Sequence, residues 1–243
     1  MRLILPAIFF CIPLSLAAQD EYEWKEPGPQ SKAYHASRMK NTTPPYSLQK
    51  IKALISKIEF NEEEEFDGLS REAFEKLSLR EKFTYSMLHA ESYSQNCDAM
   101  PPIQDEHKKI FGYLPEAFDE HYWSERQLKF LADNRDSVIA LLTESINRTK
   151  KIGLNYKHAI LEIKAWEMIP LLVKTYKIKS ADLDILTLLM QLMKEGEYQP
   201  FLESASFTKL YGEDASYLSY LNFNKANEEL IIKRAMDFYN GKK

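Results

Sequence analysis

The sequence predicts an all-α protein, and three observations support this fold class. Glycine is scarce, with 7 among 243 residues, which leaves little material for hairpin turns or glycine-rich phosphate loops. Apolar residues recur at i, i+3, i+4 and i+7 along much of the chain, which is the spacing of one helix face. Two capping boxes, SLRE at 78–81 and SERQ at 124–127, each place a serine at a helix start and a glutamate or glutamine three residues later.

The first eighteen residues have the features of a cleaved export signal. A positive start at Arg2 is followed by an uncharged apolar run over 3–16, and Ala17 and Ala18 supply a small-residue end. We expect cleavage after Ala17 or Ala18 and a mature protein in the periplasm or outside the cell. Cys11 follows two phenylalanines, which are too bulky for a lipoprotein signal, so we expect no lipid anchor. No later stretch is long and apolar enough to predict a membrane span.

Composition divides the remaining chain into two parts. Residues 19–46 mix charged, proline and small polar residues without a period, which predicts an extended segment or linker. Residues 47–243 are expected to form a single helical domain, because 44% hydrophobic content is typical of globular chains. Within it we expect an irregular helical half, 47–132, and a half of packed helical hairpins, 133–243.

The irregular half is expected to hold short helices. Ser47 and Ser70 are N-cap candidates, and the two capping boxes begin further helices. Residues 91–102 are polar and end in two prolines, which predicts a loop. Residues 103–114 are expected to form a helix that stops before Pro115.

The second half has the clearer pattern. Asn134 is expected to cap a helix that Gly153 ends in the left-handed conformation. The long helix that follows is expected to be kinked by Pro170 inside it. Residues 182–193 are apolar nearly all round, which predicts a helix at the centre of the core. A last helix is expected over about 224–239.

The second half also resembles a known architecture. Helical stretches at Arg135–Arg148, Tyr156–Tyr176 and Asp182–Met193, with Ile169-Pro170-Leu171-Leu172 inside the second, resemble HEAT-type helical repeats. The resemblance spans at most two units, and residues 47–130 show no repeat of about 40 residues. HEAT-type repeats are usually scaffolds for protein contacts. The resemblance therefore implies stacked antiparallel helical hairpins and a binding role, and it carries over no catalytic residue.

Several function classes lack support in the sequence. A formal net charge of −4 argues against nucleic acid as a partner. The chain contains no HExxH, GxSxG, Walker A, GxGxxG or CxxC motif, so no cofactor is expected. His158 with Glu162, and His121 with Glu125, have the i, i+4 spacing of two metal ligands, but no third ligand is evident. We therefore interpret both as surface pairs and expect no metal site.

One polar stretch carries the residue types of a thiol enzyme. His89, Glu91, Cys97, Asp98 and His107 lie within nineteen residues, and a histidine beside a cysteine can lower the pKa of the thiol and activate it. Cys97, His89 and His107 are the catalytic candidates of this reading. The favoured reading is that Cys97 packs as a small apolar residue and that the histidines lie on helix surfaces. Signal cleavage leaves Cys97 as the one cysteine, so no intramolecular disulfide is expected.

Two further clusters are interpreted structurally. The acidic run 62–65 with Asp67 can attract a cation or a basic partner, but it lacks EF-hand spacing and reads as a solvated turn. An aromatic segment can dock a sugar or peptide, but packing under the last helix is preferred; its members are Tyr211, Tyr217, Tyr220 and Phe223.

The sequence as a whole favours an exported, non-catalytic binding or scaffolding module whose partner is another protein or a peptide. The alternative is an enzyme with its site around the polar stretch 89–107, based on a thiol. The sequence leaves the oligomeric state open.

Overall fold

The computed structural model describes residues 25–60, 66–95, 101–178 and 182–242. Within these ranges the chain is mainly α-helical, with twelve α-helices, two 3₁₀ helices and four short strands. None of the described helices combines the length and the apolarity needed to cross a membrane. The predicted export signal, the acidic run 62–65 and Cys97 lie outside the described residues.

The α-helices are spread along the whole of the described chain. In chain order they are α1 (Pro29–Arg38), α2 (Leu48–Ile55), α3 (Arg71–Glu75), α4 (Leu79–Leu88), α5 (Glu125–Asp133), α6 (Arg135–Thr149), α7 (Leu154–Glu162), α8 (Ile169–Ile178), α9 (Asp184–Glu195), α10 (Gln199–Leu202), α11 (Ala205–Tyr211) and α12 (Lys225–Gly241). The 3₁₀ helices are η1 (Glu106–Lys108) and η2 (Trp166–Met168).

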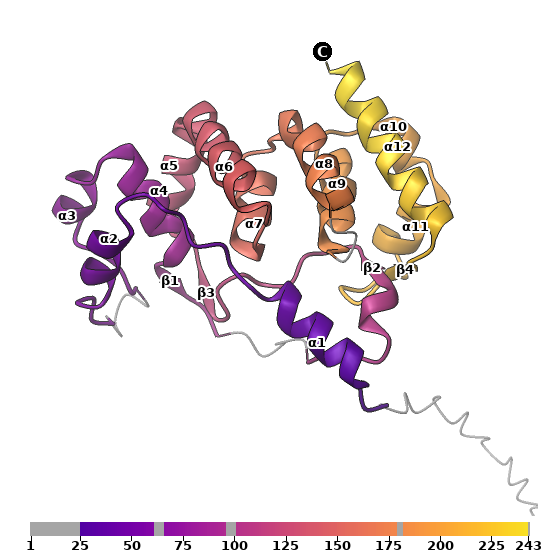
Figure 1. Cartoon of the computed structure of the whole chain (residues 1–243), viewed down its shortest axis with the longest axis horizontal. Coiled ribbons are helices and arrows are strands. Elements are labelled where there is room, and N and C mark those ends of the chain that lie inside the picture. The colour runs from indigo at the N-terminus through magenta and orange to yellow at the C-terminus, as the bar shows by residue number, and fades with distance from the viewer. Residues whose placement is uncertain (1–24, 61–65, 96–100, 179–181, 243) are drawn as a thin grey trace, which may run out of the picture.

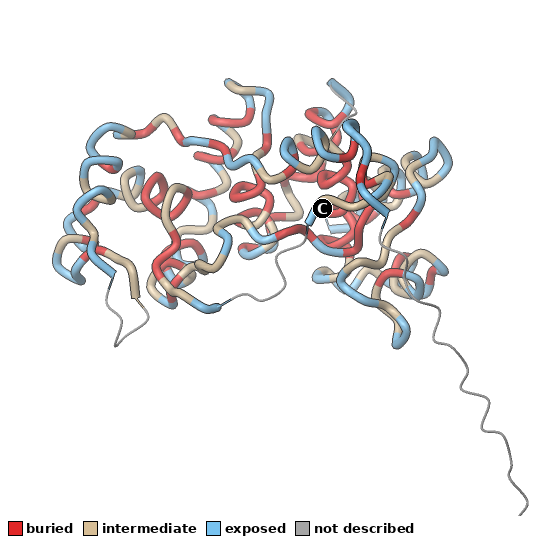
Figure 2. Tube along the Cα trace, turned by 90° about the horizontal axis from the view of Figure 1, so that it is seen from below, coloured by how far each residue is buried: buried red, intermediate tan, exposed pale blue. Residues whose placement is uncertain are grey.

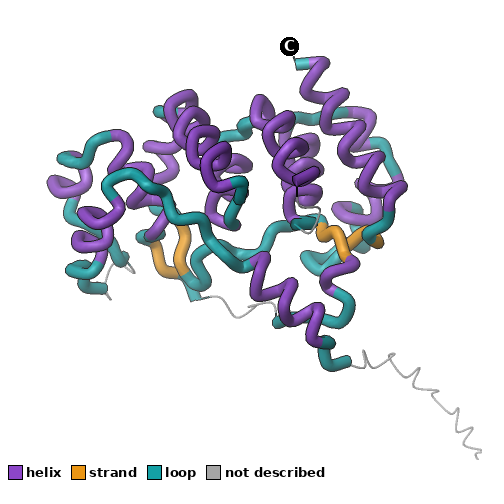
Figure 3. Tube along the Cα trace, in the orientation of Figure 1, coloured by secondary structure: helices purple, strands orange, loops and turns teal. Residues whose placement is uncertain are grey.

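Two small antiparallel ribbons join segments that are distant in the sequence. β1 (Ser92–Tyr93) pairs with β3 (His121–Tyr122), and β2 (Lys109–Phe111) pairs with β4 (Tyr220–Asn222). In the second ribbon Ile110 is opposite Leu221. This pairing ties the middle of the chain to the segment just before α12. Figure 3 shows both ribbons at one edge of the helical layer.

The helices stand side by side in chain order, from α2–α4 at one end to α10–α12 at the other (Figure 1). Helix α9 lies in the interior, where it contacts α7, α8 and α12. Its residues Asp184–Met193 are all buried, which confirms the central helix that the all-round apolar pattern predicts. Figure 2 shows the buried positions running through the middle of the helical layer, with exposed turns around them.

The local capping signals at Ser70, Ser78 and Ser124 are confirmed. Ser78 and Ser124 each begin a helix through a complete capping box. The Ser70 hydroxyl accepts a hydrogen bond from the Ala73 amide, and the Asn224 side chain accepts one from Asn227. These helix starts were predictable because each depends on residues only three positions apart.

The first capping box makes stability sensitive to acid. Glu81 accepts hydrogen bonds from Lys50 Nζ at 2.8 Å and from the Ser78 amide at 3.0 Å, and these two bonds lower the pKa of Glu81 from 4.5 to about 2. A lowered carboxyl pKa contributes stability that is present above the unfolded value and is lost as the pH falls toward the folded value.

We expect Glu81→Gln to lower the free energy of unfolding at pH 6 by about 1 kcal/mol. The difference from the unsubstituted protein should shrink as the pH falls from 4.5 toward 2, because both proteins then lack the charge. Urea unfolding at a series of pH values measures this. Glu59→Gln, at an exposed position with no ion pair to a described residue, is the control. A difference that stays constant with pH would contradict the expectation.

The expected extended segment 19–46 is wrong over 29–38, which form α1. Gly28 has extended backbone angles at the N-cap, and Pro29 occupies the first turn, where its missing N–H costs nothing. The helix packs against η1, and its last residue, Arg38, is buried. No apolar stripe marks this helix, because a buried arginine rather than an apolar face anchors it.

The expected helix at 103–114 is also wrong. Its residues form the 3₁₀ helix η1 and then strand β2, since Lys109–Phe111 pair with β4 more than a hundred residues later. The predicted loop 91–102 likewise contains strand β1, which pairs with β3. Both errors have the same cause. Each strand forms by pairing with a distant segment, and the local pattern of apolar residues gives no sign of that segment.

Two boundaries in the second half are corrected. Helix α6 ends at Thr149, and Lys150 after it takes the left-handed conformation with φ 53°. Gly153 has φ −70° and is the N-cap of α7. The expected long kinked helix is two separate helices, α7 and α8. The helical conformation is interrupted before η2 because Lys164 has a left-handed backbone with φ 49°. Pro170 then falls in the first turn of α8, where proline is tolerated.

Two expected side-chain caps are absent. Asn134 precedes α6, but its side-chain amide donates to the Phe130 carbonyl oxygen at 2.9 Å and caps the end of α5 instead. Ser47 precedes α2 in the left-handed conformation, and its side chain makes no capping bond. The helix after Asn224 runs to Gly241, as expected to within two residues.

Candidate functional site

A segment that we call the strap, residues 39–46, connects α1 to α2 and crosses the layer formed by α4 to α7 (Figure 1). A cavity of about 530 Å³ opens beside it, and we call this the strap cavity. Its walls come from the end of α1, the strap, the turn between α6 and α7, the end of α8 and the start of α9. The lining residues come from three stretches of the chain, 34–42, 149–157 and 175–185.

Hydrogen bonds to the first turn of α7 hold the strap in place. The Gly153 amide donates to Thr42 Oγ1 at 2.7 Å, and the Leu154 amide donates to the Lys40 carbonyl oxygen at 2.9 Å. Asn155 accepts from the Thr42 amide at 2.9 Å, and its own amide donates to Asn41 Oδ1 at 2.9 Å. The strap thus satisfies backbone donors that a helix start leaves without intrahelical partners.

A buried charge network lies behind the cavity wall, and Arg38 belongs to both. Arg38 Nε and Nη2 donate to the two carboxylate oxygens of Asp184 at 3.1 and 2.6 Å, and Nη1 donates to Glu106 at 2.8 Å. The three side chains are each 1% exposed. His35 Nδ1 lies 3.0 Å from both oxygens of Glu106. The paired geometry matches the fork of a guanidinium to a carboxylate.

Lys157 extends the network toward the cavity. Its ammonium lies 2.7 Å from Asp182 and 3.8 Å from Asp184. Burial alone would raise the pKa of Asp184, but Arg38 and Lys157 outweigh burial and lower it. Burial and the neighbouring Asp184 raise the pKa of Asp182, against the opposing effect of Lys157. The charged side chains of this network are therefore paired with one another.

The mouth of the cavity has a different character. Lys40, Lys150 and Lys151 line it and are exposed. None of the three forms an ion pair with a residue in the described ranges. Further inside, Ile152 and Ile185 are buried apolar walls, and Thr175 adds a hydroxyl group. The cavity thus combines a cationic mouth with a mixed apolar and polar interior.

The structure does not join the two histidines of the predicted thiol site. His89 follows α4 and its Nε2 contacts the Asp67 carbonyl oxygen. His107 lies in η1 and its Nδ1 is 3.2 Å from Ser31 Oγ on α1. Cys97 and Asp98 lie outside the described residues. The two described candidates therefore belong to separate contact networks.

Glu91, from the same polar stretch, is fully buried. It accepts hydrogen bonds from Tyr85 at 2.7 Å and Ser124 at 2.5 Å, and it pairs with Arg126. The Arg126 guanidinium also lies over the Phe74 ring. This carboxylate fastens α4 to α5 and has no oxygen turned toward solvent. It is a structural group.

The histidine–glutamate pairs find other partners. His158 Nε2 lies 2.7 Å from the Pro115 carbonyl oxygen, and His121 Nε2 lies 3.7 Å from Asp67. Across residues 25–60, 66–95, 101–178 and 182–242, no three histidine, cysteine, aspartate or glutamate side chains are placed to hold a metal ion.

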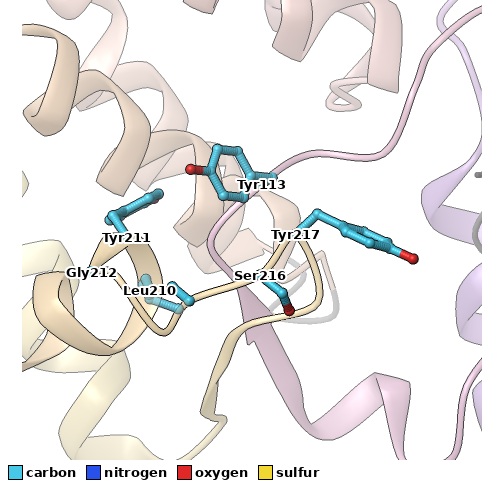
Figure 4. A pocket seen from close by; sticks show the side chains of 7 residues that line it. Tyr113, Leu210, Tyr211, Gly212, Ser216 and Tyr217 are labelled. Carbon is cyan, nitrogen blue, oxygen red and sulfur yellow. The ribbon is translucent and has the colours of Figure 1, made fainter.

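A second, smaller pocket of about 270 Å³ lies at the aromatic segment. Tyr113 and Tyr217 are 38% and 55% exposed at its rim (Figure 4). Tyr211 packs edge-on to Tyr113 at 5.4 Å and donates its hydroxyl to the Gly112 carbonyl oxygen at 2.7 Å. Tyr220 pairs in β4, where its ring contacts Phe111. Most of this segment therefore packs, and Tyr217 is its exposed member.

The strap cavity was missed by sequence reasoning, although two signals for it exist. Asp184 is an acid in the first turn of a mostly apolar helix, and Lys157 lies in the first half of α7, ahead of its apolar residues Ala159–Leu161. Charged residues at such positions are rarely buried without a partner. Comparisons with known protein families, with curated proteins and with solved structures find no match, so the strap cavity is interpreted from its geometry.

Proposed function

We propose that this protein is an exported, non-catalytic binding module that holds part of a partner protein or a peptide in the strap cavity. The observation that carries the proposal is the cavity itself. Its volume of about 530 Å³ is within the range of pockets that enclose a ligand. Its interior combines apolar walls at Ile152 and Ile185 with polar side chains that can orient a ligand.

The chemistry of the lining favours binding over catalysis. The described residues around the cavity include no histidine or cysteine. The buried cations Arg38 and Lys157 are held by carboxylates at 2.6 to 2.8 Å. Groups that are fully paired and locked in place orient a ligand, whereas a general base or nucleophile needs a free electron pair directed at the substrate.

We further propose that the helices form a HEAT-like stack of antiparallel hairpins. Successive contacts link α2 to α4, α4 to α5, α5 to α7, α7 to α9 and α9 to α12. Each helix layer thus packs mainly on its neighbours, as in repeat scaffolds. The strap cavity would then lie at one edge of the stack, where a partner segment can enter.

Filling the mouth of the cavity tests the binding role. Ser37 is an exposed residue of α1 that lines the cavity, so Ser37→Trp is expected to block entry without disturbing the core. Ala36 is exposed on the same helix but does not line the cavity, and Ala36→Trp is the matched control. The measurement is affinity purification from the native envelope fraction with the unsubstituted protein and both variants.

We expect a partner to be recovered with the unsubstituted protein and with Ala36→Trp, and its recovery to fall about tenfold or more with Ser37→Trp, since a blocked pocket loses its buried contacts. Equal recovery with all three proteins would remove the cavity from the interaction. Recovery of no partner by any of them would contradict the binding role.

A further inference from the structure

We infer that the segment received by the strap cavity is an acidic peptide, whose carboxylates are bound by Lys40, Lys150 and Lys151 at the mouth. This inference rests on the binding role proposed above and adds the chemical class of the ligand. The observation behind it is the juxtaposition of three exposed lysines, from the strap and from the α6–α7 turn, around one opening.

The balance of charge distinguishes the mouth from the buried network. In the network, Arg38 pairs with Asp184 and Glu106, and Lys157 pairs with Asp182. At the mouth, three exposed lysines add positive charge around one opening. They lie on a chain whose formal net charge is −4. A cationic opening on an acidic protein attracts anions to that place.

The three lysines at the mouth also form no ion pair with any described residue. By contrast, many other described lysines do pair, for example Lys82 with Glu75 and Lys233 with Asp237, each at 2.7 Å. Lys150 and Lys151 follow the end of α6, where cations also complement the helix dipole. A dipole role alone would affect stability and leave ligand affinity unchanged, which separates the two explanations.

The donor set favours carboxylates on a peptide over phosphate. Recognition of phosphate commonly uses the planar fork of arginine, and the arginine that lines the cavity, Arg38, is fully engaged by Asp184 and Glu106. Lysines bind as point charges. The interior beyond them offers apolar walls at Ile152 and Ile185 and a hydroxyl group at Thr175, which suits apolar side chains and backbone groups between acidic residues.

The test uses a fluorescently labelled peptide that alternates glutamate with leucine, and its glutamine counterpart as the uncharged probe. Binding is followed by fluorescence anisotropy at low and at physiological salt, with inorganic phosphate as competitor. The variant Lys150→Gln/Lys151→Gln removes two charges from the mouth. Lys52→Gln/Lys57→Gln removes two exposed lysines at α2, away from the cavity, and is the matched control.

We expect the glutamate peptide to bind, the glutamine peptide to bind at least about tenfold more weakly, and salt to weaken binding. The affinity should fall about tenfold in the mouth variant and stay unchanged in the control. Phosphate should not compete. Urea unfolding of both variants shows whether the fold is retained.

Equal affinity for the two peptides, or unchanged affinity in the mouth variant, would overturn the inference. Displacement of the bound glutamate peptide by millimolar inorganic phosphate would overturn it in favour of a free anion. If neither probe binds while Ser37→Trp still abolishes partner recovery, the inference fails and the proposed function stands. If Ser37→Trp has no effect on partner recovery, the proposed function fails, and the inference fails with it.

Discussion

Replacing Arg38 with methionine is expected to lower the free energy of unfolding by about 3–5 kcal/mol. The substitution keeps much of the apolar stem but removes a guanidinium that holds Asp184 at 2.6 Å and Glu106 at 2.8 Å. Both carboxylates are 1% exposed, so each would remain buried without the guanidinium that pairs with it most closely. Removing one partner destabilises the protein by more than the intact pair stabilises it, because the remaining carboxylates stay desolvated and no longer have the attraction of the guanidinium.

Urea unfolding followed by circular dichroism measures this effect. Lys32→Met on the same helix is the control, since Lys32 pairs with Glu26 through side chains that are 51% and 72% exposed, and such pairs contribute about 0–1 kcal/mol. The deficit of Arg38→Met should shrink at low pH, because protonation removes the orphaned charges. A deficit below about 1 kcal/mol, or one that grows at low pH, would contradict this account.

Replacing Gly153 with alanine is the second large expected effect, a loss of about 2–3 kcal/mol. A Cβ atom at this position would meet the Thr42 amide nitrogen at 2.1 Å and the Asn41 carbonyl carbon at 2.6 Å. The backbone at Gly153 has φ −70°, which alanine adopts freely, so the cost is steric rather than conformational. The strap has to move away from α7, and the hydrogen bonds between them are lost.

Gly28→Ala is a matched control, since Gly28 also precedes a helix as its N-cap, with φ −68°. A Cβ there has no neighbour within 4 Å, so this change should cost less than about 1 kcal/mol. Hydrogen exchange of residues 39–46 should accelerate in Gly153→Ala and not in Gly28→Ala. Equal destabilisation by both changes would show that cap propensity, not the strap contact, is responsible.

The sequence predicts those parts of the fold that are specified locally. The capping boxes at Ser78 and Ser124 act over three residues, and the all-round apolar pattern of 184–193 marks a buried helix. The errors in the type of element involve distant partners. Residues 109–111 become a strand because 220–222 lie beside them, and α1 forms where its last residue reaches a carboxylate in α9.

The site was less predictable than the fold. The sequence draws attention to His89, Cys97 and His107 because their types suggest chemistry, yet the two described histidines contact different elements. The strap cavity instead depends on lysines in two segments more than a hundred residues apart. A single lysine in a turn carries no signal of its own, so only the arrangement in space distinguishes these lysines from solvated ones.

The buried pair between α1 and α9 also fixes an order of events during folding. Arg38 and Asp184 are separated by 146 positions, and closing so long a loop costs chain entropy before the contact forms. A chain made from its N-terminus cannot complete this pair until residue 184 has been synthesised, whereas the contacts of α4 with α5 can form earlier. Helix α1 and the strap are thus expected to dock late, which makes the strap cavity one of the last features of the molecule to take shape.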